Sequence, residues 1–327
     1  MDREKIFDSL KFILICLVVV GHTIERNLYD NHTIMTVFGF IYSFHMPLFI
    51  FISGYFTKSI TWSKYKKSFV SIMAVYWVFQ TLFMIPSWID GSFSWIDYLT
   101  NPRSVLWYII GLLFWRLWFA ILPKKFIKFP LIMGGALVLA YGIHAVNDQN
   151  YFYTRILTFY PYFILGYFCP KEIITKIREG KKVFSIVFLA ILLVALYFFV
   201  DYTLIFSMFG GMPYKHYSSV LVGVGQITLC YILAILASMS VINLCTERFY
   251  KLGSSTLDIY LIHPFYIYYV YGLIISYYGW NPNLLIDLII SVVIILICVF
   301  VSRLKITKYL TDPVNSFKAL AKQKTAI

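Results

Sequence analysis

The sequence predicts an all-α polytopic integral membrane protein with about ten transmembrane helices in one bundle. Sixty per cent of the 327 residues are hydrophobic and only 13% are charged, about half the charged share of a soluble domain. The mean hydropathy of +0.77 reflects repeated apolar runs long enough to cross a bilayer. Lysine and arginine gather in the short connections between these runs. The net charge of +13 therefore indicates membrane topology rather than nucleic-acid binding.

Windowed hydropathy predicts the helices in chain order and one long connection, 202–218, which we expect to be partly re-entrant or interfacial. We expect a membrane domain over residues 1–310 and a basic cytosolic tail over 311–327. No small-residue cleavage site follows the first apolar run, which indicates a retained helix rather than a signal peptide. The expected helices are 6–25, 34–56, 69–90, 104–122, 127–146, 152–169, 183–201, 219–242, 256–278 and 283–303.

The loop charges alternate along the chain and predict its orientation. The basic loops are 57–68, 123–126, 170–182 and 243–255, together with both termini, whereas the alternate loops hold only Arg26, Arg103 and Lys215. By the positive-inside rule, both termini face the cytosol in a cell membrane. We then expect Lys64 and Lys176 on the cytosolic side, and Asp30 and Tyr214 outside.

Neither a disulfide framework nor a metal site is indicated. The five cysteines are scattered in or beside apolar runs without a CxxC pair. No HExxH, GxxxxGK[ST] or GxSxG pattern occurs. We therefore expect no metal and no permanently bound cofactor.

The first helix carries polar side chains on one face. Lys11 and His22 are separated by three helical turns plus about 20°, so they share a face roughly 16 Å apart along the axis. Glu25 follows His22 by three residues and can lie beside it. Lys11 can also snorkel to the cytosolic headgroups while His22 and Glu25 mark the outer interface. Their common face favours a polar track through the protein, because charged groups inside a membrane usually face its interior.

The second helix, "SFHMPLFIFISGYFTK", places His45 near the bilayer centre and Pro47 at an expected kink. Its Ser53-Gly54 pair would let another helix or a thin ligand approach closely. Arg116, Arg155 and His263 complete the intramembrane polar set. Arg116 can equally snorkel to the surface, and His263 can be a packed, hydrogen-bonded residue before a proline.

These residues resemble the membrane acyltransferase family 3, bacterial O-acyltransferases related to fucose 4-O-acetylase. Lys11, ten residues and His22 look like the family's Arg/Lys-x10-His motif, and "FHMPLFIFISGYF" looks like its second-helix signature. "LWYIIGLLFW", "YFILGYF" and "IYLIHPF" are similar to later landmarks in the same order. The resemblance covers about the whole chain. It departs from the family where arginine is usual, with Lys11 and Lys64-x-x-Lys67 instead, so bidentate contact with phosphate is lost.

The resemblance implies acyl transfer from cytosolic acetyl-CoA to a carbohydrate hydroxyl, and the residues fit that chemistry. A sugar hydroxyl needs a positioned base, and histidine suits that role near neutral pH. We expect His22 to be this base, with Glu25 orienting its ring and His45 as the competing base. We expect Trp107, Tyr108 and Arg155 at the acceptor, although interfacial aromatic belts also explain such tryptophans and tyrosines.

We expect the anionic donor to meet cations and small residues on and near the cytosolic side. Topology alone also explains the loop lysines among them. The expected donor-binding residues are Lys11, Ser53, Gly54, Lys58, Lys64, Lys67 and Arg116, with Lys66 in the same cluster. The expected partners are acetyl-CoA, a polysaccharide or lipid-linked sugar, and the lipid bilayer. The alternatives are a transporter or flippase for a lipid-linked sugar, and O-succinyl rather than O-acetyl transfer.

Overall fold

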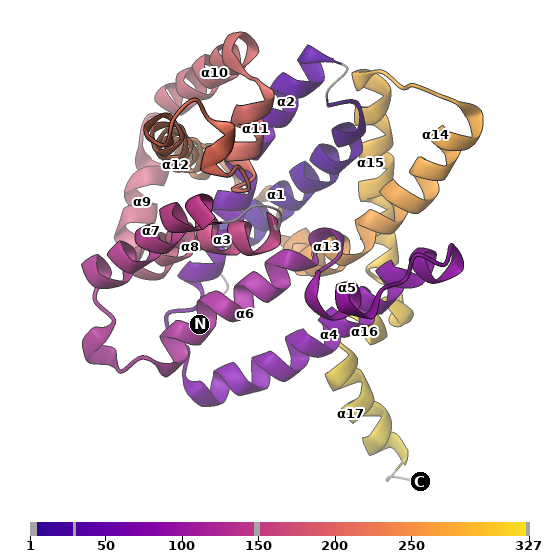
Figure 1. Cartoon of the computed structure of the whole chain (residues 1–327). Coiled ribbons are helices and arrows are strands. Elements are labelled where there is room, and N and C mark those ends of the chain that lie inside the picture. The colour runs from indigo at the N-terminus through magenta and orange to yellow at the C-terminus, as the bar shows by residue number, and fades with distance from the viewer. Residues whose placement is uncertain (1–4, 29–30, 147–150, 325–327) are drawn as a thin grey trace. The chain divides into compact units, whose positions relative to one another are not determined.

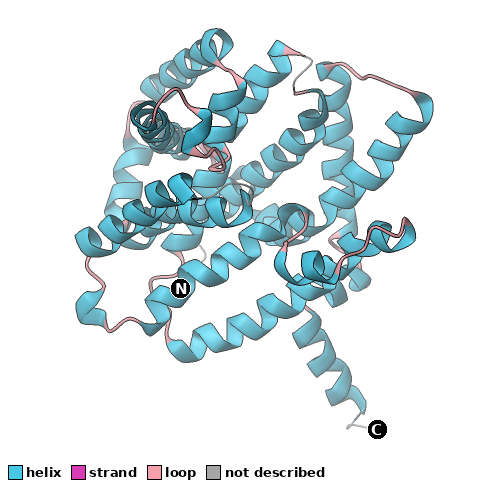
Figure 2. Ribbon diagram, viewed as in Figure 1, coloured by secondary structure: helices cyan, strands magenta, loops and turns pink. Residues whose placement is uncertain are grey.

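The computed structural model describes residues 5–28, 31–146 and 151–324, and every regular element in these ranges is helical (Figures 1 and 2). Within this part, nine helical segments are long and apolar enough to cross a membrane. The chain is thus an all-α polytopic membrane protein, as the sequence predicts. Asp30, expected to face outward, lies outside the described residues.

The α-helices are α1 (Lys5–Ile24), α2 (His32–Tyr42), α3 (His45–Tyr55), α4 (Trp62–Ile89), α5 (Trp95–Thr100), α6 (Trp107–Ile121), α7 (Phe129–Val146), α8 (Tyr151–Phe168), α9 (Lys171–Glu179), α10 (Lys182–Phe199), α11 (Tyr202–Met208), α12 (Val220–Leu244), α13 (Thr256–Pro264), α14 (Gly272–Tyr278), α15 (Leu284–Val301), α16 (Lys305–Thr311) and α17 (Pro313–Lys324). The 3-10 segments are η1 (Glu25–Asn27), η2 (Ser104–Leu106), η3 (Lys124–Phe126), η4 (Tyr214–His216) and η5 (Glu247–Ser255), and η6 (Phe265–Tyr271) is π-helical.

Helix α8 is the expected span that falls outside the nine. It forms a helix at the predicted place, but its tyrosines, two threonines and Arg155 make it less apolar than the others. Much of α8 is nevertheless buried by protein, including Phe163 and Ile164. A helix that is surrounded by other helices can carry more polar residues than one that faces lipid.

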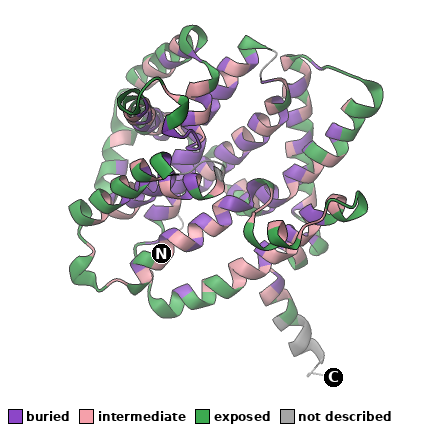
Figure 3. Ribbon diagram, in the orientation of Figure 1, coloured by how far each residue is buried: buried purple, intermediate pink, exposed green. Residues whose placement is uncertain are grey.

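The helices group into two compact units, which we describe separately. Unit 1 contains Met1–Ser59, Pro123–Ser254 and Pro282–Ser291, and unit 2 contains Ile60–Leu122, Ser255–Asn281 and Val292–Ile327. In unit 1, burial concentrates on α1, α3 and α8 (Figure 3). In the apolar stretch of α1, 67% of the residues are buried, against 11% in that of α10. The apolar surface of α10 is therefore suited to lipid contact.

The second predicted helix is broken in two, and the break lies before the expected kink at Pro47. Helix α2 ends at Tyr42, and α3 begins at His45, which puts Pro47 in its first turn. Proline is tolerated there because a first-turn amide has no intrahelical acceptor. The His45 ring bonds through Nδ1 to the Ile41 carbonyl oxygen at 2.9 Å. The break therefore fixes the orientation of the histidine.

Helices α3 and α8 pack with their backbones in close approach. A Cβ atom added to Gly54 would lie 2.0 Å from the Phe163 carbonyl oxygen, and one added to Gly166 would lie 1.9 Å from that of Phe51. Only glycine fits at these two positions. The small size of Gly54 is thus explained by helix packing, one of the two explanations that the sequence allows.

The long connection 202–218 is structured and partly buried. It forms α11 and then a turn in which Gly210 has a φ of +69°, a conformation that favours glycine. Residues Gly210 to Tyr214 that follow are buried. The connection is thus packed into unit 1, of which it is a part.

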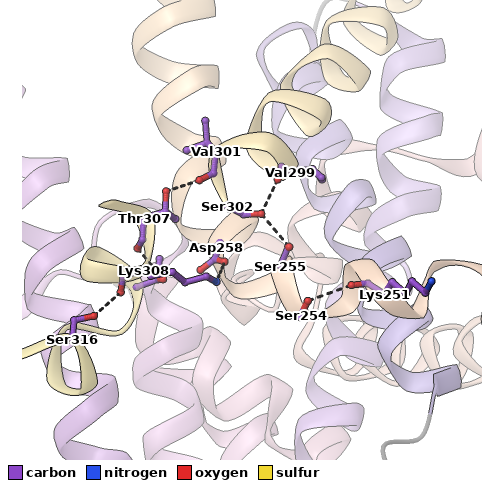
Figure 4. Close-up of polar contacts among 11 residues, drawn as sticks. Lys251, Ser254, Ser255, Asp258, Val299, Val301, Ser302, Thr307, Lys308 and Ser316 are labelled. Atoms are coloured by element: carbon purple, nitrogen blue, oxygen red, sulfur yellow. Dashed lines mark hydrogen bonds and ion pairs between the residues drawn. The ribbon is translucent and has the colours of Figure 1, made fainter. Parts of the chain in front are cut away.

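In unit 2, a polar network ties the C-terminal helices to α13 (Figure 4). The buried Asp258 carboxylate lies 2.5 Å from the Lys308 ammonium of α16. Ser302 donates to Ser255 Oγ at 3.0 Å, and Thr307 donates to the Val301 carbonyl at 2.6 Å. The expected tail, 311–327, contains the whole of α17. These contacts hold the segment before the tail in place.

Candidate active site

His22 and Glu25 form a hydrogen-bonded pair at the end of α1, as their spacing predicts. His22 Nδ1 lies 2.9 Å from Glu25 Oε2, and the two side chains are 22% and 36% exposed. An ionised carboxylate only accepts hydrogen bonds, so Nδ1 carries the proton that is shared with Glu25. In the neutral ring, Nε2 then bears the lone pair. The pair has the geometry of a general base with an orienting acid.

Arg155 of α8 joins this pair. Its charge acts on the Glu25 carboxylate, and its guanidinium carbon lies 4.8 Å from the ring centroid of Phe209. The sequence predicts Arg155 as an acceptor contact but gives no sign of its neighbours. The structure brings Arg155, Glu25 and His22 together from two helices that are far apart in the chain.

His45, the competing base, is buried at the start of α3. Its ring meets that of Tyr42 edge-on with centroids 4.4 Å apart. Tyr42 also reaches α1, because a Cβ added to Gly21 would lie 2.9 Å from Tyr42 Cε2. His45 and His22 are close enough to interact electrostatically. With Nδ1 donating to the Ile41 carbonyl, His45 too bears its lone pair on Nε2.

Lys11 is paired at the other end of α1. Its ammonium lies 2.9 Å from Asp8 Oδ1 and 5.3 Å from the ring centroid of Phe56. Asp8 is buried, since Gly253 of η5 packs directly on its backbone. Spacing alone gave Asp8 no assignment, although an acid three residues before a lysine is a recognisable helical pair.

The other expected donor residues of unit 1 have local partners. Ser53 Oγ donates to the Phe49 carbonyl at 3.0 Å. Lys58 bonds to the Cys169 carbonyl at the end of α8, and its ammonium lies 3.9 Å from the Tyr55 ring centroid. Lys58 thus helps to close the end of α8.

Unit 1 also holds an apolar cavity of about 400 Å³, lined by residues of α3, α8, α9 and α12 that include Pro47, Phe51 and Ile177. Ser238 and Tyr162 supply the hydroxyl groups of its lining. The pantetheine arm of CoA carries amide groups, and this lining offers them few hydrogen-bond partners. Burial of the arm here would therefore be costly.

The remaining expected residues lie in unit 2. Lys64, Lys66 and Lys67 line an open groove of about 790 Å³ with Val314 and Asn315 of α17. Arg116 lies within electrostatic range of Tyr65 and Tyr108. Tyr108 packs edge-on against Tyr260, with centroids 5.6 Å apart, and against the neighbouring Trp107 at 6.2 Å. All of these residues belong to unit 2.

The sequence did not single out Tyr42, Phe209 or His144. Phe209 follows α11, and its ring lies 4.6 Å from that of Tyr42. His144 Nδ1 lies 2.7 Å from the Met212 carbonyl oxygen, and Thr158 Oγ1 lies 3.0 Å from His144 Nε2. A histidine in an apolar run such as "YGIHAV" is a signal that could have led to this contact. Among the described residues, no cluster of side chains suited to a metal ion occurs.

Comparison with known proteins identifies the family. The acyltransferase family 3 model, described as an acyltransferase domain, matches residues 4–303. The chain belongs to this family. It is therefore an acyltransferase, as the helix 1 and helix 2 patterns imply.

Two curated relatives are similar over a short stretch. The nodulation protein NolL of Sinorhizobium fredii is 49% identical over 57 residues, which cover 16% of each chain. The nodulation protein NolL of Mesorhizobium japonicum is 43% identical over 60 residues, 17% of this chain and 16% of the relative. The match thus spans about a sixth of the length of these relatives. No solved structure matches the chain.

Proposed function

We propose that this acyltransferase moves an acetyl group from cytosolic acetyl-CoA to a hydroxyl of a cell-surface or lipid-linked carbohydrate. The observation that carries the proposal is the His22–Glu25 pair, 2.9 Å apart, in a chain of an acyltransferase family. A hydroxyl is a poor nucleophile at neutral pH, and an oriented imidazole removes its proton as it attacks. The pair is partly exposed, so an acceptor can approach it.

In this proposal, His22 Nε2 accepts the proton of the acceptor hydroxyl while the oxygen attacks the thioester carbonyl carbon. The new C–O bond forms, the C–S bond breaks, and the sulfur leaves as the thiolate of CoA. The imidazolium then returns its proton to this thiolate, which gives the free thiol. Glu25 stabilises the imidazolium in between through the Nδ1 hydrogen bond. The ester product and CoA account for every atom.

Donor binding is assigned to the groove of α4 and α17. The phosphates of CoA are anionic, and Lys64, Lys66 and Lys67 present three ammonium groups along one wall of the groove. All three lysines are exposed. Such contacts contribute binding energy rather than acceleration of the chemical step. Lys58 and Gly54 have structural partners in unit 1, so the groove is the better-supported phosphate site.

Acetyl-CoA consumption tests the function directly. Purified protein in lipid nanodiscs would be mixed with acetyl-CoA and a polysaccharide acceptor, and free CoA thiol and acetylated glycan would be measured. We expect thiol release that depends on the acceptor and is lost in His22→Gln. A sugar transporter would leave acetyl-CoA untouched. Preferred use of succinyl-CoA in the same assay would reassign the reaction to O-succinyl transfer.

We further propose that both termini face the cytosol and that the chain resides in the cell membrane, on the strength of the loop charges. Lys176 and Lys215 are exposed and lie in loops of opposite predicted sides. In a cysteine-free background, an impermeant maleimide should label Lys215→Cys on intact cells and Lys176→Cys only after permeabilisation. The reverse pattern would invert the topology.

A further inference from the structure

Phe209, in the long connection 202–218, contacts residues that lie next to both candidate bases, His22–Glu25 and His45. The Phe209 ring centroid lies 4.8 Å from the guanidinium carbon of Arg155, which acts on Glu25. The same ring lies 4.6 Å from the ring of Tyr42, which in turn packs edge-on on His45 at 4.4 Å. Phe209 therefore contacts both Arg155, which acts on the partner of His22, and Tyr42, which packs on His45.

The turn that carries Phe209 is anchored on α8. Gly210 donates to the Ser207 carbonyl at 2.9 Å, and a Cβ added to it would lie 3.1 Å from the Thr158 side chain. His144 donates through Nδ1 to the Met212 carbonyl at 2.7 Å and accepts from the Thr158 hydroxyl at 3.0 Å. Thr158 lies about one helical turn after Arg155. A buried histidine that the reaction does not use thus holds this turn beside Arg155.

We propose that Phe209 is a positioning residue for acyl transfer, which holds the Arg155 guanidinium within electrostatic range of Glu25 and braces the Tyr42 ring. The inference rests on the proposed function, because its effect is felt at His22. An arginine side chain has many rotamers, and an aromatic face beneath the cation favours one of them. With Arg155 fixed, the Glu25 carboxylate keeps its place and orients the imidazole. Phe209 itself contacts no reacting atom.

Substitutions at Phe209 separate positioning from ordinary packing. Phe209→Leu keeps an apolar side chain of similar size but removes the aromatic face, whereas Phe209→Tyr and Phe209→Trp retain it. We expect Phe209→Leu to lower kcat by about 3- to 30-fold, the range of a cation–π contact, with little change in KM for acetyl-CoA. The two aromatic variants should stay within about twofold of the wild type. The matched control is Phe184→Leu, the same change at an exposed position of α10, and it should leave kcat unaffected.

A double-mutant cycle with Arg155→Gln decides whether Phe209 acts through the arginine. In the Arg155→Gln background, Phe209→Leu should cost little further activity, and the thermal unfolding midpoints should show the same non-additivity. Equal kcat for Phe209→Leu and wild type, equal losses in the Leu and Tyr variants, or additive losses in the cycle would each overturn the inference. A wild-type chain that does not consume acetyl-CoA would instead overturn the proposed function, while the unfolding cycle would still report the Phe209–Arg155 coupling.

Discussion

The two ends of α1 carry the same kind of acid–base pair in different surroundings. At one end, the Lys11 ammonium lies 2.9 Å from Asp8, and at the other, His22 lies 2.9 Å from Glu25. The spacing within each pair is three residues in both cases. The Asp8 side chain is only 8% exposed, however, whereas that of Glu25 is 36% exposed. Because the sequence spacing and the distance are the same in both pairs, only the exposure distinguishes them so far.

Burial and chemistry do separate them. η5 covers Asp8, because Gly253 packs on Asp8 and Phe249 donates its backbone amide to the neighbouring Ser9 Oγ at 3.0 Å. A buried carboxylate needs its cation, so removal of Lys11 would destabilise the fold. The Glu25 carboxylate is more open than that of Asp8, and its partner is an imidazole, which can act as a general base. We therefore propose that one end of the helix serves stability and the other serves chemistry.

The largest effect is expected at His22. His22→Gln should lower kcat by about 10²- to 10⁴-fold, the contribution of a positioned general base. The unfolding temperature should change little, because the side chain is partly exposed and a helix spans lipid without an imidazole. Acetylated glycan and thermal unfolding of the two proteins would be compared at equal expression.

His45→Gln provides the comparison within the same assay. Because His45 is buried and bonded to the Ile41 carbonyl, we expect its substitution to reduce stability more than kcat. Complete loss of activity in His45→Gln with activity retained in His22→Gln would place the base on α3. His32→Gln is the control, since His32 lies at the exposed start of α2.

Glu25 should matter less than His22 but in the same direction. Glu25→Gln keeps the side-chain shape and removes a charge-assisted hydrogen bond of about 1.5–3 kcal/mol, which corresponds to about a 10- to 10²-fold lower kcat. The KM for acetyl-CoA should be unchanged, because the effect is on the stability of the imidazolium. An unaltered kcat would leave Glu25 as a marker of the outer interface only.

Disruption of the Lys11 pair should instead appear in stability. Lys11→Met leaves the buried Asp8 carboxylate without its ion pair to Lys11 and should lower the unfolding free energy by about 1–3 kcal/mol. Lys11→Arg, which keeps the charge, and the double variant Asp8→Asn/Lys11→Met should recover most of this loss. Thermal unfolding in detergent gives the ranking. A stable Lys11→Met protein with a raised KM for acetyl-CoA would support the donor-binding role that the sequence suggests.

Local periodicity made much of this helix predictable. Helix 1, the shared face of Lys11 and His22, and the position of Glu25 all follow from 3.6 residues per turn. Hydropathy likewise predicts the position of α8. The helix is less apolar than the nine candidate spans because protein, not lipid, surrounds much of its surface. The electrostatic interaction of Arg155 with Glu25 and the ring contact of Phe209 with Tyr42 join segments far apart in the chain, which no short-range pattern encodes. The sequence did not predict the break at Ser43, because Pro47 was expected to kink a continuous helix. Pro47 instead lies in the first turn of α3, where proline is tolerated.

The smallest effect is expected for the lysines that line the groove of unit 2, which are more exposed than Lys11. Lys64→Ala/Lys67→Ala removes two ammonium groups that line the groove of α4 and α17. Exposed ion pairs contribute up to about 1 kcal/mol each, so the KM for acetyl-CoA should rise by about 3- to 30-fold while kcat changes less. The effect should shrink as salt is added, because screening weakens contacts between exposed charges. Lys305→Ala, an exposed lysine of α16 that does not line the groove, is the matched control. An unchanged KM at low salt would return these lysines to a role in membrane topology alone.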